Sequence, residues 1–208
     1  MEGFITEPKE IERRSFEIIE EGLSGMSFPE DTRDIVKRVI HTTADFDYAE
    51  SLVFSEGAVE RAIKALKEKA AIVTDTMMAY SGINKKALSV LNCSIHCFMG
   101  DSDVAGEAEE RKITRAWVSM EKAATLDKKL IFAIGNAPTA LINIRKMVEE
   151  GRLEPELVIA VPVGFVNVRE AKELIIKSDI PHIVSRGNKG GSSVAAAIMN
   201  AILYKAVK

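Results

Sequence analysis

The chain has 208 residues, a formal net charge of -3 and only 6% aromatic residues. This length suits one domain with its own hydrophobic core, so we expect residues 1–208 to form a single domain. The near-balanced charge and the scarcity of aromatic rings argue against a stacking surface for single-stranded nucleic acid.

The chain also lacks the patterns of membrane and secreted proteins. Its most apolar run, "LVIAVPVGFV", is too short to span a bilayer and contains Pro162. The start "MEGFITEPKE" has neither the basic residues nor the apolar core of a secretory signal. The sequence therefore favours a soluble cytoplasmic protein that binds neither nucleic acid nor membrane.

In chain order, two amphipathic helices are predicted first, over residues 8–23 and 29–43. Five short apolar runs then follow, and we expect a strand in each: residues 70–75, 89–95, 129–135, 156–164 and 181–187. These runs are apolar nearly throughout, as is typical of strands covered on both faces. Helical patterns separate most of them, which favours an α/β protein with a five-stranded parallel sheet and extra N-terminal helices.

His41 lies near the end of the second predicted helix, and the chain has only three histidines. The apolar positions 35, 36, 39 and 40 form one stripe of this helix, and His41 falls on the opposite side. A solvent-facing histidine favoured by the helix dipole explains this position. A proton donor that titrates near neutral pH explains it as well.

Ser15 raises a similar question on the first predicted helix, where it falls inside the apolar stripe. Its hydroxyl either bonds to a backbone carbonyl one turn earlier or faces a ligand. Arg14 lies at the edge of the same face and would support the second reading.

Small and polar residues follow four of the predicted strands, in "TDTMMAYSG", "GNAPTA", "PVGFVN" and "SRGNKGGSS". Ligands of open parallel sheets bind beyond the carboxyl ends of the strands, so we expect the chemistry there. In the last segment, Ser192 or Ser193 is expected to cap a helix whose start attracts anions, and Arg186 and Lys189 add positive charge. A structural turn explains this segment equally well.

The segment "GNAPTA" is open to the same two readings. Pro138 falls in the first turn of the predicted helix, and Asn136 or Thr139 is expected to cap it. Neither this segment nor "RGNKGGSS" has the glycine spacing of a dinucleotide or phosphate-binding loop, which disfavours a nucleotide-binding protein.

Cys93, His96 and Cys97 lie close together in the sequence. Three ligands are too few for a structural zinc site, and one possible disulfide is implausible in a chain of this size. We expect two reduced, mostly buried cysteines and no bound metal.

Seven motifs occur together over nearly the whole chain: "RRSFEII", "RVIH", "TDTMMAYSGI", "ITRAW", "AIGNAPTAL", "VPVGFVN" and "RGNKGGSS". In this order they resemble the precorrin-8X methylmutase family of cobalamin biosynthesis. The resemblance implies a three-layer α/β fold of flavodoxin-like topology and a homodimer with active sites at the subunit interface.

The resemblance also implies an isomerase of corrin formation. Such an enzyme moves a methyl group from ring carbon 11 to ring carbon 12 of a tetrapyrrole, either precorrin-8X or cobalt-precorrin-8. The product is hydrogenobyrinate or cobyrinate, formed by an acid-assisted 1,5-sigmatropic shift that needs no cofactor. A non-catalytic corrinoid-binding or carrier protein with the same cradle is the alternative.

The resemblance places the family's catalytic histidine at His41 and its substrate-binding serine and arginines at Ser15, Arg38 and Arg115. Arginines suit the task, because each can clamp a substrate carboxylate with two hydrogen bonds. Further substrate-binding residues are expected in the matching motifs and the neighbouring helices: Arg14, Asp75, Thr76, Gly82, Thr114, Gly135, Asn136, Thr139, Arg186, Gly190, Gly191 and Ser192.

Overall fold

The fold is that of a computed structural model, which describes residues 4–208. Its centre is a six-stranded sheet with the strand order β1-β6-β5-β4-β2-β3. The strands are β1 (Leu52–Phe54), β2 (Ala71–Thr74), β3 (Ser94–His96), β4 (Leu130–Ile134), β5 (Pro155–Ala160) and β6 (His182–Ser185). The pairs β3–β2, β2–β4, β4–β5 and β5–β6 are parallel, and β1 pairs antiparallel with β6.

The prediction of a five-stranded sheet was wrong in two details. It omitted β1, a three-residue edge strand too short to show a periodic pattern. It also began the run at 89–95 too early, because residues 89–91 belong to a helix and only Ser94–His96 pair with β2. The other four runs contain β2, β4 and β6 in full and β5 except for its first residue.

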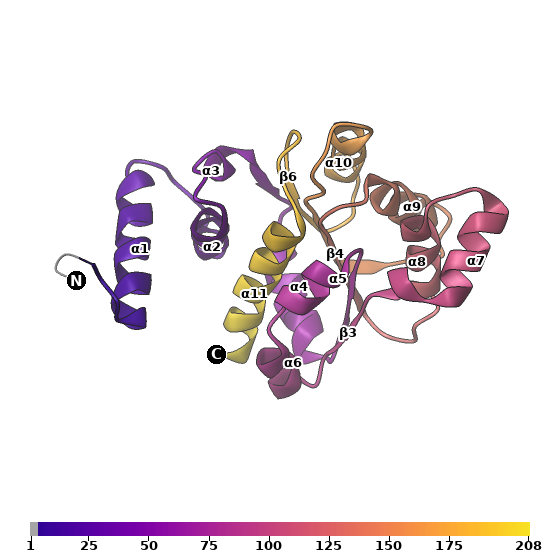
Figure 1. Cartoon of the computed structure of the whole chain (residues 1–208), viewed down its shortest axis with the longest axis horizontal. Helices are drawn as coiled ribbons and strands as arrows, with labels where there is room; N and C mark the ends of the chain where they lie inside the picture. The colour runs from indigo at the N-terminus through magenta and orange to yellow at the C-terminus, as the bar shows by residue number, and fades with distance from the viewer. Residues whose placement is uncertain (1–3) are drawn as a thin grey trace.

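Helices cover both faces of the sheet (Figure 1). They are α1 (Pro8–Gly22), α2 (Arg33–Thr43), α3 (Tyr48–Ser51), α4 (Ala58–Lys67), α5 (Met77–Gly82), α6 (Lys85–Leu91), the 3-10 helix η1 (Phe98–Gly100), α7 (Ser102–Arg111), α8 (Arg115–Ala123), α9 (Pro138–Glu149), α10 (Val168–Ile176) and α11 (Ser192–Val207). No helix among residues 4–208 is both long enough and apolar enough to cross a membrane.

Strand β4 shows why the apolar runs do not alternate with polar residues. Ile131 and Ala133 enter the core formed with α2, α4 and α11, whereas Leu130, Phe132 and Ile134 enter the core formed with α8, α9 and α10. Successive side chains of a strand point to opposite faces, so burial on both faces requires apolar residues at every position.

The two N-terminal helices pack outside this arrangement. Helix α2 lies against α11, and α1 lies beyond α2 at the edge of the molecule (Figure 1). The groove between α2 and α11 opens toward α1, which covers part of it. The candidate site lies in this groove.

Candidate active site

His41 lies in the last turn of α2 and is exposed, whereas the apolar positions 35, 36, 39 and 40 of the same helix are buried. The prediction that it faces away from the apolar stripe is thus confirmed. Its imidazole ring stacks on Phe16 of α1, with ring centroids 5.0 Å apart and an interplanar angle of 8°. This contact holds an otherwise exposed ring in one plane.

His41 lines a cavity of about 300 Å³, which we call the inner cavity. Arg38 and Thr42 of α2 form one wall with it, and Gly82 at the end of α5 closes one side. The opposite wall is the face of α11 that carries Ser193, Ala196, Ala197, Asn200 and Tyr204. Two of the predicted substrate-binding residues, Arg38 and Gly82, therefore meet at His41.

Asn200 fixes the wall that contains Gly82. Its side-chain Nδ2 donates to the Gly82 carbonyl at 2.9 Å, and its Oδ1 accepts the backbone N–H of Asn84 at 2.8 Å. The Asn84 side chain in turn donates to the Tyr204 hydroxyl at 3.2 Å. These bonds hold the link between α5 and α6 against α11, so the width of the inner cavity is set by polar contacts as well as by packing.

Arg38 faces the cavity between two aromatic rings. Its guanidinium lies 5.1 Å from the centre of the Phe16 ring and 5.5 Å from that of Tyr204, within the range of cation–π attraction. Glu12 lies 3.7 Å away and is mostly exposed, so it neutralises Arg38 only weakly. Arg38 is therefore oriented toward the cavity while its charge stays available to an anionic ligand.

The two predicted substrate-binding residues of α1, Arg14 and Ser15, differ in their exposure to solvent. Arg14 is exposed and forms ion pairs along its own helix, with Glu17 at 3.3 Å and Glu21 at 3.9 Å. Ser15 is half-buried next to Phe16. The structure therefore places Ser15 on a more buried part of α1 than Arg14, which lies on its outer surface.

Asp75 follows β2 and is almost fully buried. Its carboxylate accepts the backbone N–H groups of Gly135, Asn136 and Ala137, at 2.9, 2.8 and 2.6 Å. Burial raises the pKa of this carboxyl, against the lowering effect of the three amide donors. Asp75 thus ties the end of β2 to the start of α9.

The expected helix caps were wrong. Ala137 occupies the N-cap of α9 and, among residues 4–208, no side chain caps this helix, so neither Asn136 nor Thr139 has the predicted role; Asp75 binds only N–H groups that precede the helix. Gly191 occupies the N-cap of α11, and its φ of +133° places Ser192 and Ser193 inside the helix.

The strand-end segments pack tightly around the start of α11. The Thr76 and Ser192 hydroxyls are 2.7 Å apart and share a hydrogen bond. A Cβ on Gly135 would lie 2.6 Å from the Ser192 Cα, so only glycine fits there. A Cβ on Gly190 would lie 2.1 Å from the Val161 carbonyl oxygen.

Lys172 of α10 binds the backbone of the loop between β6 and α11. Its buried ammonium donates to the carbonyls of Gly187 and Lys189, at 2.9 and 2.8 Å, and burial lowers its pKa to about 8. The Lys189 side chain reaches the segment after α2, where it bonds Asp45 and Asp47 at 2.6 Å each. These carboxylates raise the pKa of Lys189 and connect the loop to the chain just beyond His41.

The remaining predicted residues lie away from the inner cavity. Thr114 caps α8, and its hydroxyl lies 2.7 Å from that of Thr139. Arg115 is exposed at the start of α8, on the face of the sheet opposite α2 (Figure 1). Arg186 turns toward α10 and lies 3.8 Å from Glu173.

Beyond its first turn, the contribution of α11 to the site was not predicted from the sequence. Ser193, Ala197, Asn200 and Tyr204 recur on one face of this otherwise apolar helix. Polar residues at helical spacing in an apolar run were the available signal. Phe16 gave no such signal, because an aromatic residue in an apolar stripe is ordinary core composition.

The cysteines take no part in this site. Cys93 and Cys97 are free and half-buried, and the Cys93 thiol lies 3.1 Å from the Leu66 carbonyl oxygen. Within residues 4–208, no group of three or more His, Cys, Asp or Glu residues has the geometry to hold a metal ion.

Fold and site together define a doubly wound α/β protein with a cavity lined by a histidine and an arginine. A family model described as precorrin-8X methylmutase matches residues 10–205. A cobalt-precorrin-8 methylmutase from Salmonella typhimurium is 42% identical, over 97% of this chain and 97% of the relative. One from Leptospira interrogans is 40% identical, over 96% of this chain and 94% of the relative.

A crystal structure of a precorrin-8X methylmutase from Thermus thermophilus is similar in fold. It superposes with a TM-score of 0.88 at 34% identity, and the match covers 96% of each chain. The chain therefore belongs to the precorrin-8X methylmutase family.

Proposed function

We propose that this enzyme is an isomerase that converts cobalt-precorrin-8 to cobyrinate by moving a methyl group from ring carbon 11 to ring carbon 12. The relatives at 40 and 42% identity are named for the cobalt-containing substrate, and the Thermus protein at 34% is named for the metal-free one. This difference in identity favours the cobalt form as the substrate.

The observation that carries the proposal is the position of His41 in the inner cavity. Substrate and product are isomers, so a proton that His41 lends to the conjugated ring must be returned once the methyl group has moved. Protonation draws electron density from the ring and lowers the barrier to the 1,5-shift. Proton transfer from a positioned side chain typically contributes about 10²–10⁴-fold to the rate.

The arginines and helix ends would hold the acidic side chains of the substrate. Arg38 lines the inner cavity together with His41 and can bind a carboxylate with two hydrogen bonds. Within one chain, Arg115 and Thr114 lie on the opposite face of the sheet. We therefore infer a homodimer in which a second copy brings these residues to the cavity.

The test is to mix the purified protein with cobalt-precorrin-8, and separately with precorrin-8X, and to follow the visible spectrum. The methyl shift extends the ring conjugation, so turnover changes the colour. We expect conversion of both, with a higher kcat/KM for the cobalt form. Binding of either compound without conversion would instead identify a corrinoid carrier.

A further inference from the structure

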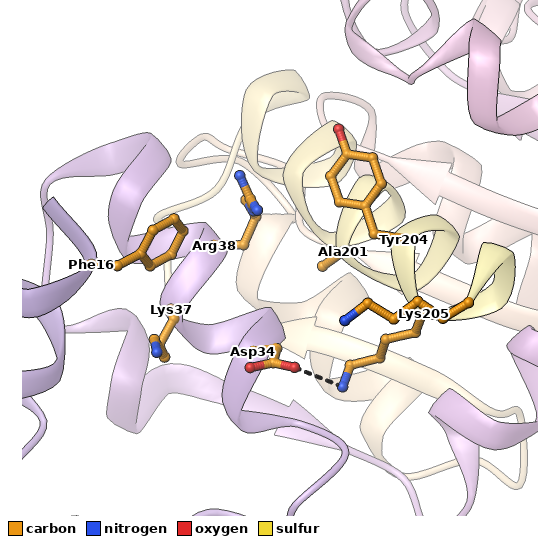
Figure 2. Close-up of a pocket in the computed structure, with 8 residues that line it drawn as sticks. Phe16, Asp34, Lys37, Arg38, Ala201, Tyr204 and Lys205 are labelled. Carbon is orange, nitrogen blue, oxygen red and sulfur yellow. Dashed lines mark hydrogen bonds and ion pairs between the residues drawn. The ribbon is translucent and has the colours of Figure 1, made fainter. Parts of the chain in front are cut away.

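A second pocket adjoins the inner cavity, and we call it the outer pocket (Figure 2). It has a volume of about 230 Å³ and lies between Phe16 of α1, the middle of α2 and the end of α11. Arg38 and Tyr204 line both spaces, so these two side chains form the wall that the pockets share. A ligand at His41 that extends beyond this wall therefore reaches the outer pocket.

The outer pocket concentrates positive charge in a chain whose formal net charge is -3. Its lining includes four cations and one acid: Lys37, Arg38, Lys205, Lys208 and Asp34. Lys37 pairs with Glu20 of α1 at 2.8 Å, a carboxylate that also binds Arg33. Lys205 donates to Asp34 at 2.9 Å, and this bond lowers the pKa of the Asp34 carboxyl (Figure 2).

The spacing along α2 connects the two pockets. Asp34, Arg38 and His41 lie at i, i+4 and i+7, so they share one face of the helix. A rise of 1.5 Å per residue puts the Asp34–Lys205 pair about 10 Å along the axis from His41. A macrocycle with its reacting carbons at His41 would direct a peripheral side chain toward this pair.

The composition of the outer pocket suits a carboxylate on a short aliphatic arm. Ala201 and the rings of Phe16 and Tyr204 provide apolar contact surface, and the ammonium of Lys205 lies at the far end. In the free protein, the carboxylate of Asp34 occupies the position that such a group would take beside Lys205.

We propose that Lys205 binds a peripheral carboxylate of the tetrapyrrole substrate, and that Asp34 is the internal carboxylate that holds Lys205 in place until the substrate arrives. This inference rests on the proposed function, because it assumes that the reacting part of the ring lies at His41. It assigns Lys205 to substrate affinity and not to the methyl shift.

Two variants separate this role from a merely structural ion pair. Lys205→Gln removes the cation and leaves Asp34 facing the groove, so KM should rise about tenfold, the size expected for one charged hydrogen bond. Asp34→Asn frees Lys205 for the substrate, so KM should fall about twofold or more. In both variants kcat should stay within about twofold of the wild type. Lys177→Gln, at an exposed position after α10, makes the same charge change away from the groove and should leave KM unchanged.

A purely structural pair would behave differently, because both substitutions break the same contact. They would then lower the free energy of unfolding to a similar extent and leave KM alike in both variants. That result would overturn the proposal.

The proposed function can fail separately, and the same variants still give an answer. If the wild type converts neither precorrin, spectral titration with cobyrinate measures binding directly. Lys205→Gln should then weaken binding about tenfold and Asp34→Asn should strengthen it, with no such difference for a fully amidated corrinoid. Equal affinities of both variants for cobyrinate, or no binding by the wild type, would contradict the proposal.

Discussion

Asp75 offers the sharpest test of how the strand ends are held together. Its carboxylate joins two segments some sixty residues apart by accepting three backbone N–H groups, from Gly135, Asn136 and Ala137. Two of these donors share Oδ2 and the third uses Oδ1. The substitution Asp75→Asn keeps the shape of the side chain but replaces one acceptor oxygen with an NH₂ donor.

The cost of this substitution follows from the geometry. The remaining oxygen can serve at most the donors on its own side, so at least one buried N–H loses its partner and faces another donor. A hydrogen bond to a charged group contributes about 1.5–3 kcal/mol, and an unsatisfied buried donor costs about 1–3 kcal/mol. We therefore expect Asp75→Asn to lower the free energy of unfolding by about 3 kcal/mol.

Urea unfolding, followed by far-UV circular dichroism, measures this change. Asp127→Asn is a matched control at an exposed position and should stay within about 0.5 kcal/mol of the wild type. If Asp75→Asn lowers the free energy of unfolding by less than about 1 kcal/mol, the reasoning is refuted, because the three hydrogen bonds then do not stabilise the fold.

Three further predictions follow from single contacts. Phe16→Leu removes the ring that stacks on His41. An aromatic contact contributes about 1 kcal/mol, so kcat should fall about fivefold. An unchanged kcat would contradict the role of Phe16 in positioning His41. Gly135→Ala puts a Cβ 2.6 Å from the Ser192 backbone and should lower the free energy of unfolding in urea by about 2 kcal/mol or more. An unchanged free energy of unfolding would show that the start of α11 can shift to make room for the methyl group. Burial lowers the pKa of Lys172 from 10.5 to about 8, so between these values the unfolded chain holds a proton that the folded chain has released. Between pH 8 and 10.5 the free energy of unfolding should thus rise with pH, by about 3 kcal/mol relative to that of Lys172→Met. If the two proteins differ in free energy of unfolding by the same amount at both ends of this pH range, the pKa of Lys172 is not lowered.

Much of the sheet was predictable because its signal is local. A strand buried on both faces is apolar nearly throughout: β4 is apolar at every position, and β2, β5 and β6 carry polar residues only at or next to their ends. Strand β1 was missed because its three residues pair only with β6, a partner about 130 residues further along the chain. Residues 89–91 precede the strand in one apolar run, but they form the last turn of α6, in which only Leu91 packs against the core.

The site was predictable only where one helix carries the information. The exposure of His41 follows from the helical period of its own apolar neighbours. The stacking of Phe16 on His41 does not, because it depends on how α1 packs against α2. The bonds of Asp75 and Lys172 depend on backbone groups in other segments, which no side-chain pattern reveals.

The central claim is that His41 delivers the proton that assists the methyl shift. The most direct measurement compares His41→Gln with the wild type in single-turnover conversion of cobalt-precorrin-8, together with substrate affinity from the same spectra. We predict affinity within about threefold of the wild type and a rate lower by about 10² or more. Conversion by His41→Gln at close to the wild-type rate would contradict the account.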